Sequence, residues 1–225
     1  MLIYVTGDVH GDLSRFKGRS AKKLKKNDVL IVCGDFGFVW DGSKKEAATL
    51  KWLGKRGYEI LFVEGTHDNL DLLAQYPLVE YRGGSARQIS GRCYQLLRGE
   101  IYTIDERTFF TFGGGESPDM DTRVPGETWW ENELPSQQEL SHGRETLAAH
   151  NNQVDFVVTH QPSYTVNNFL ELDSDLHHTN QLAAFFDEIS QTVEFQRWFF
   201  GCCHVDKWIP PRYRALYQEI LPIDL

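Results

Sequence analysis

The sequence predicts a layered α/β fold around a largely buried β-sheet, and three observations support this prediction. Short apolar runs rich in valine, isoleucine and phenylalanine recur along the chain, and each stops at a glycine or a polar residue. Helical patterns lie between the early runs, whereas the middle of the chain holds closely spaced strand-like runs. Runs of this length are typical of buried strands, and their alternation with helices favours a layered architecture.

Buried strands are expected wherever the apolar runs occur. These runs are Leu2–Thr6, Val29–Cys33, Ile60–Glu64, Val154–Thr159 and Phe195–Phe200. Between the first three runs we expect helices over Leu13–Lys26 and Lys44–Lys55. All elements should belong to a single domain over residues 1–225, because a chain of 225 residues is long enough for one large core.

The middle and the end of the chain are expected to be organised differently. Residues 79–112 hold short runs separated by glycine, arginine and acidic residues, which predicts antiparallel strands. Long loops are expected over 113–128 and 161–178. The remaining predicted elements are a helix over Ser136–His150, a helix capped by Thr179 that runs to Ser190, and a final alternating strand over Tyr213–Ile220.

Composition predicts a globular protein of the cytoplasm. Hydrophobic residues make up 41% of the chain and charged residues 24%, which is ordinary for such proteins. We expect no association with a membrane, because no stretch approaches the length of a spanning helix and the first apolar run meets Asp8 too early for a secretory signal. Four cysteines without framework spacing favour a reducing compartment.

The charge of the chain is uneven. A net charge of −9 disfavours long nucleic acids as partners, yet residues 15–26 carry only positive charges. This basic segment is expected either to be a solvated surface or to attract a polyanionic substrate. Arg123 and Arg212 are further candidates for contact with a phosphate group, because a guanidinium can donate two parallel hydrogen bonds to it.

The polar residues at the ends of the predicted strands are carboxylates and imidazoles. They are Asp8, His10, Asp35, His67, Asp68, His160 and His204. In open α/β sheets, ligands bind at the carboxyl ends of the strands, and these side chains suit manganese, iron or zinc. Each residue alone is typical of a turn or of a hydrogen-bonded structural histidine. Five strand ends with the same residue types together predict a metal site.

Five short motifs at these strand ends resemble the signatures of the calcineurin-like metallophosphoesterase superfamily. They are GDVHG (7–11), GDFG (34–37), GTHD (65–68), VTH (158–160) and GCCH (201–204). Their order and spacing match over nearly the whole chain. The resemblance implies an αββα sandwich, in which two mixed β-sheets are flanked by helices, and hydrolysis of phosphomonoester or phosphodiester bonds by a metal-activated hydroxide.

The resemblance also implies a role for each matching residue. Asp8, His10 and His204 would hold a first divalent cation (Mn, Fe, Zn or Co), Asp35 would bridge to a second, and His160 would bind the second.

His67 would protonate the leaving group, and Asp68 would orient the ring of His67. The expected substrate is a phosphorylated small molecule or a nucleotide.

Two positions depart from the pattern, and both belong to the second cation. Thr66 stands where the family has asparagine, and Cys202 stands where it has histidine. Both side chains are shorter than the expected ligand, so we expect one occupied site and a weakened second one. Alternatively, Asp35, His160 and Cys202 form a remodelled site that favours zinc, because thiolate is a soft ligand.

The two departures also leave a different class of function open. A phosphoesterase-like fold that has lost its activity would act as a scaffold for a protein partner. His67 and Asp68 favour the enzyme, because a scaffold has no need of an acid for a leaving group.

Overall fold

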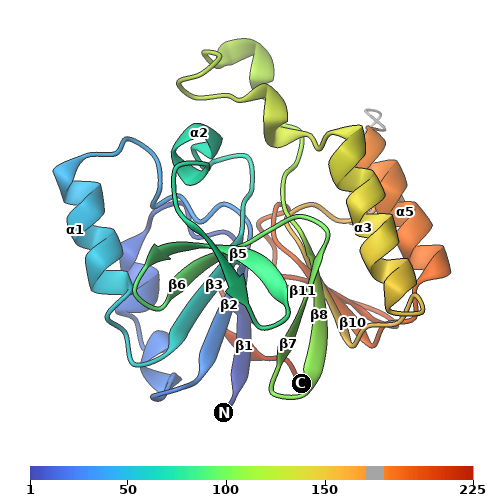
Figure 1. Cartoon of the computed structure of the whole chain (residues 1–225), viewed down its shortest axis with the longest axis horizontal. Helices are drawn as coiled ribbons and strands as arrows, with labels where there is room; N and C mark the ends of the chain where they lie inside the picture. The colour runs from blue at the N-terminus through green and yellow to red at the C-terminus, as the bar shows by residue number, and fades with distance from the viewer. Residues whose placement is uncertain (171–179, 225) are drawn as a thin grey trace.

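A computed structural model describes residues 1–170 and 180–224, which form two β-sheets packed face to face with helices on the outside (Figure 1). The first sheet has the strand order β13-β1-β2-β3-β6-β5-β4, and the second has the order β11-β12-β10-β9-β8-β7. Both sheets contain parallel and antiparallel pairs. The predicted αββα sandwich of two mixed sheets is therefore confirmed.

The strands have the following bounds. In the first sheet they are β1 (Ile3–Thr6), β2 (Val29–Cys33), β3 (Glu59–Val63), β4 (Leu78–Tyr81), β5 (Gly84–Ser90), β6 (Cys93–Leu96) and β13 (Leu221–Pro222). In the second sheet they are β7 (Glu100–Ile104), β8 (Arg107–Phe112), β9 (Phe156–Thr159), β10 (Arg197–Phe200), β11 (Lys207–Ile209) and β12 (Tyr213–Ala215). The run of strands expected over 79–112 is thus divided between the two sheets.

The helices cover the outer faces of the sheets. Their bounds are α1 (Lys44–Leu53), α2 (Leu70–Leu73), α3 (Gln137–Ala149), α4 (Tyr164–Leu170) and α5 (Gln181–Thr192). Figure 1 shows α1 beside the first sheet, with α3 and α5 beside the second. The side chains of Ser43 and Ser136 cap α1 and α3 by accepting backbone N–H groups, as these residue types favour.

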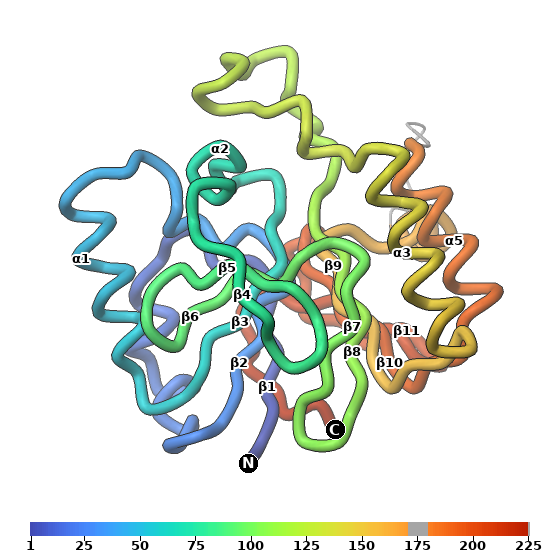
Figure 2. Tube along the Cα trace, viewed as in Figure 1, coloured from blue at the N-terminus to red at the C-terminus, as the bar shows by residue number. Residues whose placement is uncertain are grey.

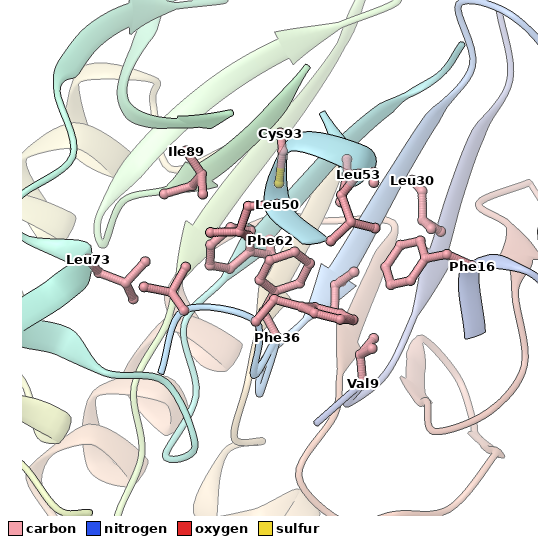
Figure 3. Close-up of a cluster of buried hydrophobic side chains, with 14 of the residues drawn as sticks. Val9, Phe16, Leu30, Phe36, Leu50, Leu53, Phe62, Leu73, Ile89 and Cys93 are labelled. Carbon is pink, nitrogen blue, oxygen red and sulfur yellow. The ribbon is translucent and has the colours of Figure 1, made fainter. Parts of the chain in front are cut away.

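The alternation of side chains along β2 shows how the layers are built. Val29, Ile31 and Cys33 pack between the two sheets, whereas Leu30 and Val32 face the layer that contains α1. Figure 3 shows this outer cluster, in which Leu50 of α1 packs near Phe62 of β3 and Phe36. The rings of Phe36 and Phe62 are stacked with their centroids 4.1 Å apart. Strands buried on both faces explain the continuous apolar runs in the sequence.

Three predicted elements are wrong in detail. The helix expected over Leu13–Lys26 is instead two short 3-10 turns, at Leu13–Phe16 and Ala21–Lys23. Gly18 lies between the turns, and glycine inside a helix is unfavourable because it loses much conformational freedom there.

The loop expected over 161–178 contains α4, while its residues 171–178 and the expected cap Thr179 lie outside the described residues. Asn180 caps α5. Of the final strand expected over Tyr213–Ile220, only Tyr213–Ala215 is a strand, β12. The chain then crosses from the second sheet to the first, where β13 pairs with β1.

Residues 113–135 form an excursion that extends beyond the sandwich, drawn yellow-green in Figure 2. Its backbone is tied back to the end of β3, where Gly114 N–H donates to the Glu64 carbonyl over 2.8 Å. Arg98, which is largely buried, donates through Nη2 to the carbonyls of Asn132 and Glu133 and through Nε to the Glu64 carboxylate. The excursion therefore has a fixed base next to the third sequence motif.

Candidate metal centre

The carboxyl ends of strands from both sheets meet at one place. β1, β2 and β3 run parallel in the first sheet, and β9 and β10 run parallel in the second. The residues that follow these strands contact one another across the sheets. They are Asp8 and His10 after β1, Asp35 after β2, His67 after β3, His160 after β9 and His204 after β10.

Glycines next to these residues allow the strand ends to approach closely. A Cβ atom on Gly34, whose φ is +102°, would lie 2.0 Å from Nδ1 of His160. A Cβ atom on Gly201 would lie 2.0 Å from Oδ1 of Asp8. No side chain fits at such distances, so glycine at these two positions is a requirement of the cluster itself.

Asp8, His10 and His204 direct their ligand atoms toward one another. Nε2 of His204 lies 3.1 Å from Asp8 Oδ2 and 3.0 Å from Nε2 of His10. Oδ2 of Asp35 lies 3.7 Å from Nε2 of His10. The resemblance names these four residues as ligands of the first cation, and the structure brings all four together.

His160 adds a buried nitrogen that has no hydrogen-bond partner. Its Nε2 lies 3.7 Å from Asp35 Oδ1, and its Nδ1 lies 3.5 Å from Asp8 Oδ1, beyond a good hydrogen bond. Within the described part of the chain, His160 Nδ1 is one of the few buried side-chain atoms without a hydrogen bond. An unpaired imidazole nitrogen between two carboxylates fits a divalent cation.

The charge balance of the cluster also fits a cation. Asp8 and Asp35 are 1% and 2% exposed. Burial raises the pKa of each carboxyl. Nearby imidazoles, with His160 foremost, together lower it by more than burial raises it, so both carboxyls are ionised. Burial opposes protonation of His160, yet the charges of Asp35 and Asp8 raise its pKa well above the usual value. Two buried carboxylates therefore draw positive charge into the site.

The cluster is open to solvent on the side of its imidazoles. The side chains of His10, His67 and His204 are 32%, 43% and 48% exposed, whereas those of the carboxylates Asp8 and Asp35 are almost fully buried. A ligand can therefore reach the cluster across the histidine rings.

The backbone is held in an uncommon conformation at the cluster. His10, Asp35, Cys202 and His204 have φ values of +49°, +41°, +61° and +50°. Left-handed backbone is rare for residues other than glycine, and when it occurs it concentrates at functional sites. Among the described residues the same backbone also occurs in ordinary turns, for example at Arg82 and Asp105, so it supports a site only together with the converging ligand atoms.

His67 is held on both sides of its ring. Nδ1 lies 2.8 Å from Asp35 Oδ2, and Nε2 lies 2.8 Å from Nη2 of Arg123. Because a guanidinium can only donate, Nε2 is the acceptor and Nδ1 carries the proton that it donates to Asp35. The imidazole is therefore neutral in this arrangement.

Asp68 does not orient the ring of His67, which corrects the expectation from the sequence. Its buried carboxylate accepts backbone N–H groups from Phe36, Gly37 and Gly65, at 3.1, 2.7 and 3.0 Å. Burial, together with the charge of Asp35, raises the pKa of Asp68 to about 7. Asp68 thus joins the loops after β2 and β3, and Asp35 holds His67.

Thr66 and Cys202 lie beside the cluster, but their side chains do not complete it. Thr66 Oγ1 lies 3.3 Å from His67 Nδ1. The backbone N–H of Cys202 donates to the Asp8 carboxylate at 3.0 and 3.1 Å. Among the described residues, the sulfur of Cys202 belongs to no group of three or more histidine, cysteine, aspartate and glutamate ligand atoms lying within 4.8 Å of one another.

Arg15 and Tyr217 support the cluster and were missed in the sequence. Arg15 donates to the carbonyls of Asp8 and Tyr217, at 3.0 and 2.6 Å, and to the Thr6 hydroxyl. The ring of Tyr217 stacks on His204 with centroids 4.7 Å apart. Arg15 was grouped with the exposed lysines of the basic segment, although Leu13 and Phe16 nearby in the sequence could have indicated its partial burial.

The two arginines proposed for phosphate contact have different places in the structure. Arg123 reaches the cluster from the excursion. Arg212 lies over the ring of Phe195, 3.8 Å from its centroid, and donates to the Ser190 carbonyl. Arg212 therefore packs against the second sheet.

No helix within residues 1–170 and 180–224 is long and apolar enough to cross a membrane.

The fold and the cluster together define an αββα protein with a candidate metal centre at the ends of its central strands. A family profile described as calcineurin-like phosphoesterase matches residues 1–201. The chain belongs to the calcineurin-like phosphoesterase family, and divalent metals are the cofactors of that family.

Solved structures of related shape are only distantly similar. One is a protein from Staphylococcus aureus assigned as a 5'-nucleotidase, with 13% identity and a TM-score of 0.46 over 96% of this chain and 48% of that one. Another is a phosphopantetheinyl hydrolase from Mycobacterium tuberculosis, with 14% identity and a TM-score of 0.40 over 96% of this chain and 89% of that one. This chain spans about half the length of the first. No curated protein matches the sequence.

Proposed function

We propose that this chain is a cation-dependent phosphoesterase that hydrolyses phosphomonoester or phosphodiester bonds. One observation carries the proposal: Asp8, His10, Asp35 and His204 converge beside a buried nitrogen of His160 that has no hydrogen-bond partner. A set of carboxylate and imidazole ligands suits manganese, iron, cobalt or zinc. Membership of the calcineurin-like phosphoesterase family supports the same activity.

Asp8, His10, Asp35 and His204 would hold the cation, with His160 contributing from the buried side. A divalent cation at that place lowers the pKa of water and polarises a phosphate oxygen, which is the chemistry that hydrolysis of a phosphoester needs. The backbone N–H of Cys202 donates to the Asp8 carboxylate, and the Arg15 guanidinium donates to the Asp8 backbone carbonyl. These two contacts fix Asp8 in position.

His67 is the proposed acid for the leaving group. It stands beside Asp35 on the exposed side of the cluster, and Asp35 fixes its ring through Nδ1. An anionic substrate competes with the neutral ring for the guanidinium of Arg123, which leaves Nε2 free to take up a proton from solvent and to deliver it to the leaving group. General acid catalysis of this kind contributes about 10²–10⁴-fold to the rate.

The proposed substrate is a phosphorylated small molecule or a nucleotide. The site is open on its histidine side. The exposed lysines of the basic segment add positive charge that attracts an anionic substrate over a longer distance. The acidic remainder of the chain disfavours long nucleic acids.

A panel of phosphomonoesters and phosphodiesters, assayed with manganese, cobalt, nickel and zinc in turn, tests the proposal. We expect turnover that requires an added cation, and a kcat lowered about 10²–10⁴-fold in His67→Asn without loss of cation binding. His142→Asn is the matched control, because His142 is an exposed histidine that pairs with Glu100. Absence of turnover with every cation and substrate in the unmodified protein would contradict the proposal.

The alternative function is that of a binding scaffold, and the side chains of Thr66 and Cys202 favour it. Metal analysis of protein purified without chelator separates the two. Less than about half an equivalent of any transition metal supports the scaffold, since an intact site binds its metal tightly.

A further inference from the structure

The ligand set fits one divalent cation better than two. Asp8, His10 and His204 form one group of ligand atoms. The two other groups, Asp8 with Asp35 and His160, and His10 with Asp35 and His67, share members with it and with each other. At the positions expected to complete a second set, the Thr66 hydroxyl lies beside His67, and the sulfur of Cys202 belongs to no group of histidine, cysteine, aspartate and glutamate ligand atoms among the described residues.

A cationic side chain of the protein itself contacts Thr66, one of the two positions expected to complete a second set of metal ligands. The Arg123 side chain is 7% exposed, and its Nη2 lies 2.8 Å from His67 Nε2. Its Nη1 donates to the backbone carbonyl of Thr66 over 2.9 Å. Since the opposite side of the same ring contacts Asp35, the guanidinium is separated from Asp35 by one imidazole.

Arg123 is held in this place by the excursion. Its Nε pairs with Asp119 at 2.8 Å, and its Nη1 also donates to the Thr128 carbonyl at 3.3 Å. Both partners lie in the excursion, whose base is fixed by Arg98. The guanidinium is thus a preorganised donor rather than a mobile surface charge.

We propose that Arg123 supplies the second positive charge of this centre, so that one divalent cation and one guanidinium together bind the phosphate group. This inference rests on the proposed function. A phosphate oxygen is a stronger acceptor than a neutral imidazole, so the substrate takes the Nη2 donor from His67. The planar guanidinium can donate two hydrogen bonds to phosphate, which a spherical ion cannot do with the same directionality.

Binding of Mn²⁺ and of inorganic phosphate, both measured by calorimetry, tests this inference without a turnover assay. We expect one Mn²⁺ per chain in the unmodified protein. In Arg123→Met the stoichiometry should stay at one, while phosphate affinity for the Mn²⁺-loaded protein falls about 10- to 100-fold, the usual worth of hydrogen bonds to a charged group. Arg123→Lys should retain part of the affinity. Arg144→Met is the control, because Arg144 of α3 forms a solvent-exposed pair with Glu188 of α5.

The double variant Thr66→Asn/Cys202→His gives the converse test. Histidine tolerates the left-handed backbone at position 202, so the variant should fold, bind a second Mn²⁺ and depend less on Arg123 for phosphate affinity. Two cations per unmodified chain, or unchanged phosphate affinity in Arg123→Met, would overturn the inference and leave the phosphoesterase proposal standing. Failure to bind any cation would overturn both.

Discussion

Nε2 of His10 lies 3.0 Å from Nε2 of His204, although 194 residues separate them in the sequence. At this distance one ring donates a proton to the other. A hydrogen bond with Asp8 raises the pKa of His204, whereas burial lowers the pKa of His10, so the proton belongs to His204. A cation that binds between these side chains must displace that proton.

Replacing either histidine should weaken cation binding and its dependence on pH. We expect His10→Ala and His204→Ala each to lower Mn²⁺ affinity at least about tenfold, since loss of a ligand exceeds the effect of losing an outer partner. In the unmodified protein, affinity should rise with pH through and above 6.5, because the proton on His204 must leave first.

Calorimetric titrations of the apo protein at several pH values measure both effects. His150→Ala is the control, because His150 is exposed and contacts its own helix through Thr146. Unchanged affinity in both alanine variants would show that the cation, if bound, lies elsewhere.

Asp68 should make stability fall as the pH rises. Its pKa is about 7 in the folded protein and near 3.8 when exposed, so the folded state keeps a proton that the unfolded state releases. This contribution is complete below pH 3.8 and is lost as the pH rises through about 7. In Asp68→Asn, which carries no proton to lose, the free energy of unfolding should therefore decline less over this interval.

Urea unfolding of the apo protein between pH 4 and pH 8 measures the difference. Asp206→Asn is a matched control, because the exposed Asp206 carboxylate also accepts backbone N–H groups, from residues 217–219. A constant difference in stability between the unmodified protein and Asp68→Asn would contradict the raised pKa.

The basic segment should act on substrate capture rather than on turnover. Lys22→Glu is expected to raise KM a few-fold at low salt with kcat unchanged, and the effect should disappear near 0.5 M salt, where the Debye length is only about 4 Å. Lys207→Glu makes the same change of charge at an exposed position outside the basic segment. Steady-state kinetics across a salt series decides the matter, and equal effects of the two variants would point to net charge alone.

The buried pair of Arg98 and Glu64 should carry a large share of local stability. Arg98→Met leaves the Glu64 carboxylate, 3% exposed, without its cation and should cost about 3–5 kcal/mol. Arg82→Met, which breaks a partly exposed pair with Glu59, should cost about 1 kcal/mol or less. Denaturant unfolding measures both, and similar losses in the two variants would contradict the role assigned to burial.

Local sequence signals were enough for most of the architecture. The run Val29–Cys33 became β2 with the same bounds, because a strand buried on both faces is apolar throughout. Ser136 marked the start of α3, since its capping box with Glu139 lies within four residues. The broken strand after Tyr213 was not predictable in this way, because the partner that captures its end is β1, more than 200 residues earlier.

In the candidate site, too, local sequence predicts some features, whereas others depend on residues far apart in the chain. The positions of Asp8, Asp35 and His160 follow from the ends of buried strands, and the sequence pattern finds them. Asp68 was assigned to its neighbour His67, but its partners are backbone groups after β2, which no local pattern reveals. The contact between Arg123 and His67 likewise spans 56 residues and depends on the path of the excursion.

The left-handed backbone at His10, Asp35, Cys202 and His204 limits how this centre can evolve. Replacements drawn from glycine, asparagine, aspartate and histidine meet little steric resistance there, whereas valine and isoleucine carry a penalty before any chemistry is considered. A library that randomises these positions should therefore be depleted of branched residues among its folded members.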